Sequence, residues 1–200
     1  MNSNSKSNGF GNGSLLTGPH NDSLVNGTND REACPKRWIA VLVKMNTEKK
    51  VGEQLNKLNI ENYVPTQIEI HQWSDRKKKV NRIVIPMVVF VYLSEEEEKQ
   101  LLKYSFILKI LSYPGQKGTA IIPEDQIERL KYMLKHADSK VELTNNVYKL
   151  GGKVQIARGP LKNLIGELCY VEQNKSMVAI RIESLGFACV NISKSDVISI

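Results

Sequence analysis

The residue types that most often carry catalysis or hold metals are few and scattered in this sequence. Its three histidines, His20, His71 and His136, stand far apart, and neither a CxxC pair nor a His-based ligand spacing accompanies them. No Ser/His/Asp or Cys/His set can be assembled from the motifs present. We therefore expect no catalytic residue, no metal site and no cofactor, and we predict that the protein is not an enzyme.

The chemistry that the sequence does offer is that of cations. Lys and Arg number 28 against 21 Asp and Glu, so the 200-residue chain has a formal net charge of +7. The densest basic run is HQWSDRKKKVNR, residues 71–82, which lacks any helical or alternating apolar pattern and is predicted to be a hairpin loop. Such a run can attract phosphates, with Trp73 as a stacking surface, or can simply be solvated. Both interpretations stay open.

The cysteines and the apolar runs indicate a soluble protein in a reducing compartment. Cys34, Cys169 and Cys189 cannot all pair, and we interpret them as reduced thiols. The longest uncharged apolar run, residues 84–93, is about half as long as the roughly twenty residues of a membrane-spanning helix. We expect no membrane contact and a cytoplasmic location.

The N-terminal half has the pattern of an α+β domain. Residues 1–36 are rich in Asn, Ser and Gly and are predicted to be a disordered tail. Apolar runs then predict strands over residues 38–44, 63–70, 83–93, 107–111 and 120–122. Helices are predicted to begin near Glu48, after Ser94, where Glu97 completes a capping box, and after Pro123. The order β-α-β-β-α-β, followed by a short strand and a helix, fits a ferredoxin-like split β-α-β sandwich with one open sheet face.

The C-terminal quarter has the pattern of a small β-barrel. Residues 136–148 are predicted to be a linker, long enough for the parts on either side to move independently. Beyond it, Gly152, Gly159 and Gly166 recur every seven residues, but glycine disfavours the helix that a heptad would need. Alternating apolar residues between the glycines predict short strands joined by tight turns. The glycines would lie at bends or at positions of positive φ.

Two stretches resemble a known family. The spacing Gly152-x-Val154-x-Ile156-x-x-Gly159-Pro160, continuing to Gly166, resembles the KOW motif of an SH3-like barrel. Residues 38–65, with the helix EKKVGEQL and Tyr-Val-Pro, resemble the start of a NusG N-terminal (NGN) domain, as does the strand Ile-Pro-x-x-x-Phe-Val. Residues 37–200 therefore resemble a NusG-family elongation factor, nearest to the specialised UpxY-like and RfaH-like antiterminators. Met87 and Val88 depart from the usual small or polar residue and Tyr after the proline, which implies a more aliphatic polymerase contact.

The resemblance implies an NGN domain over residues 37–135 and a KOW domain over residues 149–200. It implies docking of the open sheet face on the clamp coiled coil in the largest subunit of RNA polymerase. The residues implied for this contact are Leu42, Val88, Phe90 and Ile110. Those implied for contact with the non-template DNA strand, at a strand–helix corner, are Lys44, Thr47, Lys50 and Gln54. Alternatively, the apolar set is ordinary core and the lysines form a solvated helix face.

The resemblance also implies a function. A factor of this kind promotes read-through of specific operons, such as those for capsular polysaccharide, and we expect it to act as a monomer. Its KOW domain would recruit a ribosomal protein, or Rho, or neither. A housekeeping NusG and a ribosome-associated, RNA-binding KOW protein remain the alternatives, although the second leaves the N-terminal domain without a purpose.

Overall fold

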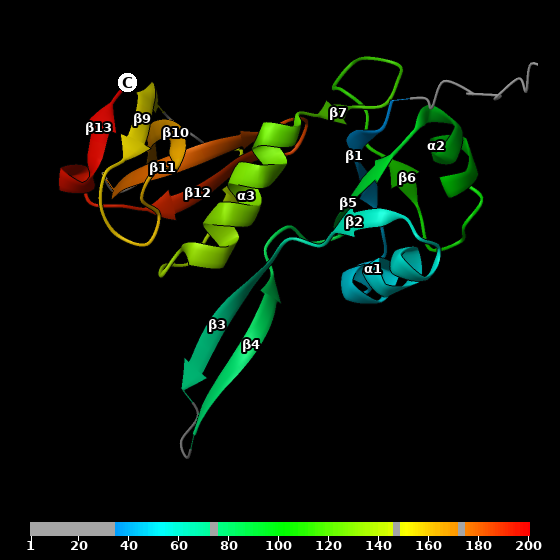
Figure 1. Cartoon of the computed structure of the whole chain (residues 1–200), viewed down its shortest axis with the longest axis horizontal. Coiled ribbons are helices and arrows are strands. Elements are labelled where there is room, and N and C mark those ends of the chain that lie inside the picture. The colour runs from blue at the N-terminus through cyan, green and yellow to red at the C-terminus, as the bar shows by residue number, and fades with distance from the viewer. Residues whose placement is uncertain (1–34, 73–75, 146–148, 172–174) are drawn as a thin grey trace, which may run out of the picture. The chain divides into compact units, whose positions relative to one another are not determined.

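The computed structural model describes residues 35–72, 76–145, 149–171 and 175–200, and Figure 1 shows their arrangement. The tail expected over residues 1–36 lies outside these ranges except for its last two residues. Residues Cys34–Ile200 cluster into one compact unit, a mixed α/β structure with more strand than helix. None of the described helices is long and apolar enough to cross a membrane.

The N-terminal sheet is antiparallel throughout. Its strands are β1 (Arg37–Leu42), β2 (Glu61–Tyr63), β5 (Val88–Leu93), β6 (Lys109–Ile110) and β7 (Ile121–Ile122). They follow the order β2-β5-β1-β6, and β7 pairs with β1 as well. The run over residues 83–93 is not one strand, because β5 begins only after Pro86 and Met87. Proline cannot donate a ladder hydrogen bond, so the expectation that pairing starts beyond Pro86 is confirmed.

Three helices accompany this sheet, namely α1 (Glu48–Lys57), α2 (Glu95–Leu101) and α3 (Glu124–His136). The capping box before α2 is confirmed, since the Glu97 N–H donates to the Ser94 hydroxyl at 3.3 Å and the Ser94 N–H donates to the Glu97 carboxylate at 2.8 Å. This local pairing satisfies two backbone donors that the helix start would otherwise leave free.

The two faces of the N-terminal sheet are buried in different hydrophobic clusters. One face, with Ile39 and Val41 on β1 and Val89 and Val91 on β5, packs with residues of α1 and α2. The other face, with Trp38, Ala40, Val88 and Phe90, belongs to a cluster that includes α3 and the C-terminal sheet. Val88 is 3% exposed and Phe90 is fully buried. The expectation of an open sheet face is therefore wrong for this structure.

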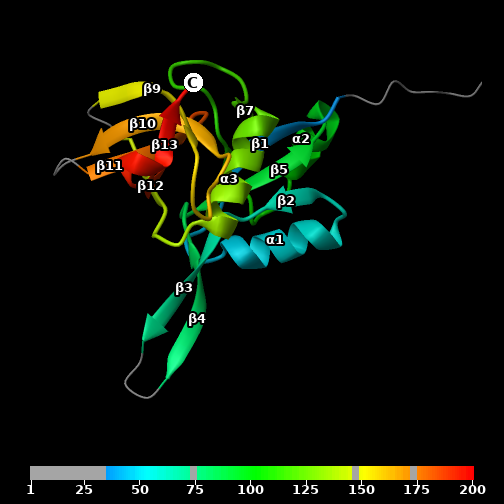
Figure 2. The same cartoon turned by 60° about the vertical axis from the view of Figure 1, so that its left-hand side comes forward.

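The described part of the basic run lies mostly in strands and not in a loop, since residues 71–72 end β3 and residues 77–82 belong to β4. Strands β3 (Thr66–Gln72) and β4 (Lys77–Ile83) form a separate two-stranded antiparallel hairpin that projects from the other elements in both views (Figure 1 and Figure 2). Its base is held by Arg82, whose guanidinium donates to the Val141 carbonyl at 2.8 Å and pairs with Glu69. Farther out, Ile68 and Ile70 of β3 are exposed, and so are the first five residues of β4. Because β4 has no buried face there, its sequence has no apolar alternation. Trp73 lies outside the described residues.

The C-terminal sheet consists of short antiparallel strands, as expected for residues 149–200. They are β9 (Lys149–Ile156), β10 (Ile165–Val171), β11 (Lys175–Ile182), β12 (Gly186–Asn191) and β13 (Val197–Ser199), with a 3-10 turn at Lys194–Asp196. Strand β8 (Glu142–Thr144) completes the order β13-β9-β10-β11-β12-β8. Because β8 pairs with β12, part of the predicted linker belongs to the sheet.

The heptad-spaced glycines have separate local reasons. Gly159 has φ of +83° in the turn after β9, a conformation that only glycine adopts freely. A Cβ on Gly166 would lie 2.6 Å from a methyl of Val178 and 2.7 Å from the Ala179 carbonyl oxygen, so the close approach of β10 and β11 excludes a side chain. Gly152 has neither constraint.

Candidate functional site

The apolar set implied for polymerase contact does not share one face. Leu42 pairs with Val88, and Ala40 with Phe90, so Leu42, Val88 and Phe90 point to the same side of the sheet. Ile110 pairs with Val41 and packs in the cluster under α1 and α2. Ile110 therefore lies on the opposite face from the other three residues of the set, because directly paired residues face the same way and Val41 faces the helices.

The face with Val88 and Phe90 is closed by aromatic and aliphatic packing. The Tyr63 ring stacks on Phe90 with centroids 6.2 Å apart, and the Lys131 ammonium of α3 lies 4.9 Å from the centre of the Trp38 ring and 5.6 Å from that of Tyr63. Burial raises the pKa of the Tyr63 hydroxyl well above its usual value, and the nearby Glu128 carboxylate raises it further. The Lys131 ammonium, placed over the rings of Trp38 and Tyr63, and the neutral Tyr63 hydroxyl therefore lie at the rim of this cluster.

The strand–helix corner presents two uncompensated cations. Lys44 and Lys50 are exposed, and neither side chain has an ion-pair partner among the described residues. Thr47 is differently placed, because its hydroxyl donates to the Lys44 carbonyl at 2.6 Å and shapes the turn. Gln54 is half-buried one turn of α1 beyond Lys50.

A buried carboxylate connects this corner to the edge of the apolar face. Glu48, the first residue of α1, accepts a hydrogen bond from the Met87 N–H at 2.7 Å, and Val43 N–H donates to the Met87 carbonyl at 2.9 Å. Met87 directly precedes Val88 on β5. The corner and the start of β5 are therefore held as one unit, which nothing in the local sequence indicates.

The residues of the KOW-like motif are structural. Val154 and Ile156 on β9 are buried in the core, Gly159 and Pro160 form the following turn, and Gly166 lies on β10. They set the hydrophobic interior and the turn of the C-terminal sheet. Of the motif residues, Gly152, Gly159 and Pro160 are exposed, whereas Val154, Ile156 and Gly166 are buried.

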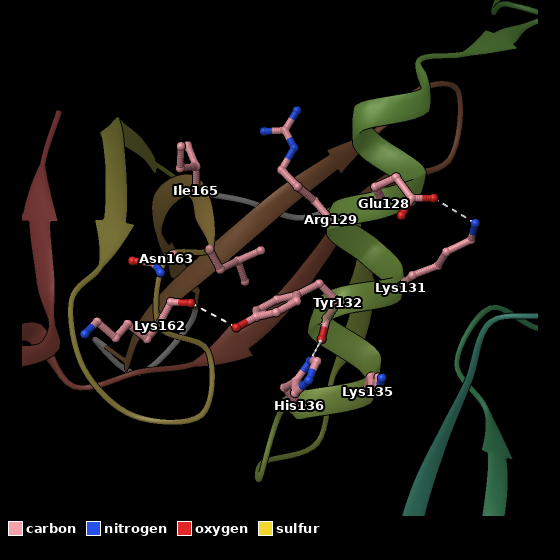
Figure 3. Close-up of a pocket in the computed structure, with 10 residues that line it drawn as sticks. Glu128, Arg129, Lys131, Tyr132, Lys135, His136, Lys162, Asn163 and Ile165 are labelled. Atoms are coloured by element: carbon pink, nitrogen blue, oxygen red, sulfur yellow. Dashed lines mark hydrogen bonds and ion pairs between the residues drawn. The ribbon is translucent and has the colours of Figure 1, made fainter.

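A groove that the sequence did not reveal lies between α3 and the loop from β9 to β10 (Figure 3). It encloses about 630 Å³, and Tyr132 of α3 reaches across it to donate a hydrogen bond to the Lys162 carbonyl at 2.9 Å. The two sides are about thirty residues apart in the chain, so neither motif nor periodicity could associate them. Among the described residues, no group of three or more His, Cys, Asp or Glu side chains could hold a metal ion.

Comparisons with known proteins agree with the N-terminal architecture. Residues 36–131 match the family model of NusG, described as transcription termination factor nusG. The transcription termination/antitermination protein NusG of Staphylococcus carnosus (strain TM300) is 23% identical over 169 residues, which cover 78% of this chain and 90% of that protein. NusG of Staphylococcus epidermidis (strain ATCC 12228) is 24% identical over 169 residues, which again cover 78% of this chain and 90% of that protein.

Among solved structures, the one described as "Domain interaction in Thermotoga maritima NusG" covers 82% of this chain and 97% of its own, at 17% identity and a TM-score of 0.42. The family match coincides with β1 to β7, α1, α2 and the first part of α3. Residues 36–131 are therefore similar to the NusG family of transcription termination and antitermination factors.

Proposed function

We propose that this protein is a NusG-like transcription elongation factor that acts as a specialised antiterminator. The observation that carries the proposal is the family match over residues 36–131, which coincides with the N-terminal sheet and its helices. In this proposal residues 37–135 form an NGN domain of ferredoxin-like topology, and residues 149–200 form an SH3-like KOW barrel. The protein works by binding and not by catalysis.

The docking surface for the polymerase clamp consists of Leu42, Val88 and Phe90, with Trp38 and Tyr63 at its margin. Because Val88 and Phe90 are buried, docking requires α3 and the C-terminal sheet to withdraw from this face. Leu42 is only half-buried and is the first residue of the set that a partner can reach. The departure at Met87 and Val88 makes this surface aliphatic, which suits an apolar helical partner.

The DNA contact consists of Lys44 and Lys50, which hold phosphates of the non-template strand, with Gln54 beside them. Thr47 contributes by fixing the turn that spaces the two lysines, since its hydroxyl already has a partner. The link from Glu48 to Met87 couples this corner to the docking surface, so both partners would meet one rigid unit.

The proposed target is a particular operon, such as one for capsular polysaccharide, with the KOW domain recruiting a ribosomal protein or Rho. The curated relatives favour a second candidate, a housekeeping NusG, because both are proteins of that name. Occupancy measured by ChIP-seq separates the two. Enrichment at one locus supports specialisation, whereas occupancy that follows polymerase across the genome supports the housekeeping role.

Polymerase docking is tested by co-purification with tagged full-length protein. We expect Leu42→Asp to reduce recovery of polymerase subunits, because a charge in an apolar contact must be desolvated without a partner. Leu102→Asp, at the end of α2 and exposed, introduces the same charge away from the proposed surface and serves as the control. Equal polymerase recovery with both variants would contradict the docking surface, and recovery of ribosomes instead of polymerase would contradict the proposed function.

A further inference from the structure

The groove between α3 and the β9–β10 loop is strongly basic (Figure 3). Four of its lining residues are cations, and the carboxylate of Glu128 is its one acidic member. Glu128 is already paired with Lys131 at 2.8 Å, and Arg129 is paired with Asp125. Lys135 and Lys162 have no ion-pair partner within the part of the chain that the structure describes, and both are exposed. Lys135 comes from α3 and Lys162 from the β9–β10 loop, so each side of the groove contributes one lysine without an ion-pair partner in that part of the chain.

The same groove contains two aromatic rings in contact, tilted by 34° to each other. Tyr132 and His136 are one helical turn apart on α3, with ring centroids 4.3 Å apart. The Nδ1 of His136 hydrogen-bonds the Tyr132 carbonyl at 2.9 Å, and the Tyr132 hydroxyl is held by the Lys162 carbonyl, so both rings are fixed in place. Tyr132 nevertheless remains 36% exposed. A planar ligand can stack on a ring that is already ordered without a further entropic cost for the ring.

The loop side supplies a polar group suited to a base edge. Asn163 is exposed, lines the groove and has φ of 71°, in the left-handed region. Leu164 beneath it is buried and gives the groove an apolar floor. Cations from two elements, an exposed aromatic ring and an adaptable amide together are the features with which proteins bind single-stranded nucleic acid.

We propose that this groove binds single-stranded nucleic acid, with a base stacked on Tyr132 and neighbouring phosphates held by Lys135 and Lys162. Duplexes are disfavoured because their bases are already stacked and cannot reach the Tyr132 ring. The site is separate from Lys44 and Lys50 and does not depend on polymerase docking. It would let the protein hold a strand, RNA or displaced DNA, through the contact between α3 and the C-terminal sheet.

The test is fluorescence anisotropy with the full-length protein and labelled oligouridylate, oligodeoxythymidylate and a duplex, each across a salt series. We expect both single strands to bind more tightly than the duplex, and the stronger of the two identifies RNA or DNA as the ligand. Uridine monophosphate is included as a competitor. Displacement of the strand at equal nucleotide concentration would overturn the proposal in favour of a mononucleotide pocket.

Two variants and a matched control locate the binding. In the double variant Lys135→Ala with Lys162→Ala, the slope of log binding constant against log salt concentration should become shallower by about 1.4. Each phosphate contact on a single strand contributes about 0.7 to this slope. Lys103→Ala with Lys117→Ala removes the same charge from exposed positions elsewhere and should leave the slope unchanged. An equal effect of both pairs would overturn the site.

The ring is tested separately. Tyr132→Ala should weaken binding by about 5- to 150-fold, the range for the loss of one stacked base. Tyr132→Phe keeps the ring but loses the hydrogen bond to Lys162, so it should retain most of the binding. If Tyr132→Phe loses as much affinity as Tyr132→Ala while both melt like the unmodified protein, the ring does not stack on a base and the proposal fails.

Discussion

Replacement of Phe90 by alanine decides whether the polymerase-docking face is closed in solution. Phe90 is fully buried, stacked on Tyr63, and in one cluster with Leu130 and Met133 of α3. Removing a phenyl ring from such a site costs about 3–5 kcal/mol, from lost transfer free energy and the cavity left behind. For a chain of this size each kcal/mol lowers Tm by about 2–4 °C, so the expected decrease is about 6–20 °C.

The measurement is urea unfolding and calorimetry on the full-length protein. Ile68→Ala is the control, because Ile68 is 63% exposed on the hairpin and should change stability by less than about 0.5 kcal/mol. A change below about 1 kcal/mol for Phe90→Ala would refute the closed face and restore the interpretation of an open, preformed docking surface. A decrease of the expected size would mean that docking on this face must first displace the elements that cover it.

The remaining predictions concern the corner, a turn and the half-buried phenol of Tyr63. The double variant Lys44→Ala with Lys50→Ala is tested on a paused elongation complex with an exposed non-template strand. The slope of log binding constant against log salt concentration should become shallower by about 1.4, while binding to the clamp persists. An unchanged slope would mean that both lysines contact only solvent. Gly159→Val should destabilise the protein by about 1–3 kcal/mol in denaturant unfolding, because φ is +83° there, whereas Gly152→Ala should have little effect; equal effects would contradict a conformational role. Folding raises the pKa of the Tyr63 hydroxyl. The stability that this group contributes is therefore complete below the pKa of the unfolded chain, near 10, and declines as the pH rises above that value. In Tyr63→Phe, the free energy of unfolding should therefore depend less on pH above about pH 10. An identical alkaline profile for Tyr63→Phe would show that folding does not raise the pKa of this phenol.

Elements with a local cause were predictable from the sequence. The capping box of Ser94 and Glu97 depends on residues three apart, and the apolar spacing of Val51 and Leu55 produces the buried stripe of α1. The start of β5 after Pro86 follows from the missing N–H of proline. In each case the interacting groups are neighbours in the chain, so the pattern itself contains the energetic reason.

Strands stabilised by a distant partner were not predictable in the same way. The basic strand β4 exists because it pairs with β3 over seven residues, and β8 exists because it pairs with β12. Neither has the apolar alternation of a half-buried strand, since both faces of the outer hairpin are exposed and β8 is short. Strand formation at such positions depends on cross-strand neighbours more than on intrinsic preference.

The sequence by itself determined the residue types of the candidate sites, namely the lysines of the corner, the apolar set on β1 and β5, and the glycine-rich motif of the C-terminal sheet. The tertiary structure alone decided which of them act together. It placed Ile110 on the opposite face, because a shift of one residue in register reverses every side chain of a strand. It buried Val88 and Phe90 in one hydrophobic cluster with α3 and the C-terminal sheet, and it brought Tyr132 to Lys162 to form a groove. Burial and proximity between distant segments are properties of packing, to which each short stretch of sequence contributes only one side.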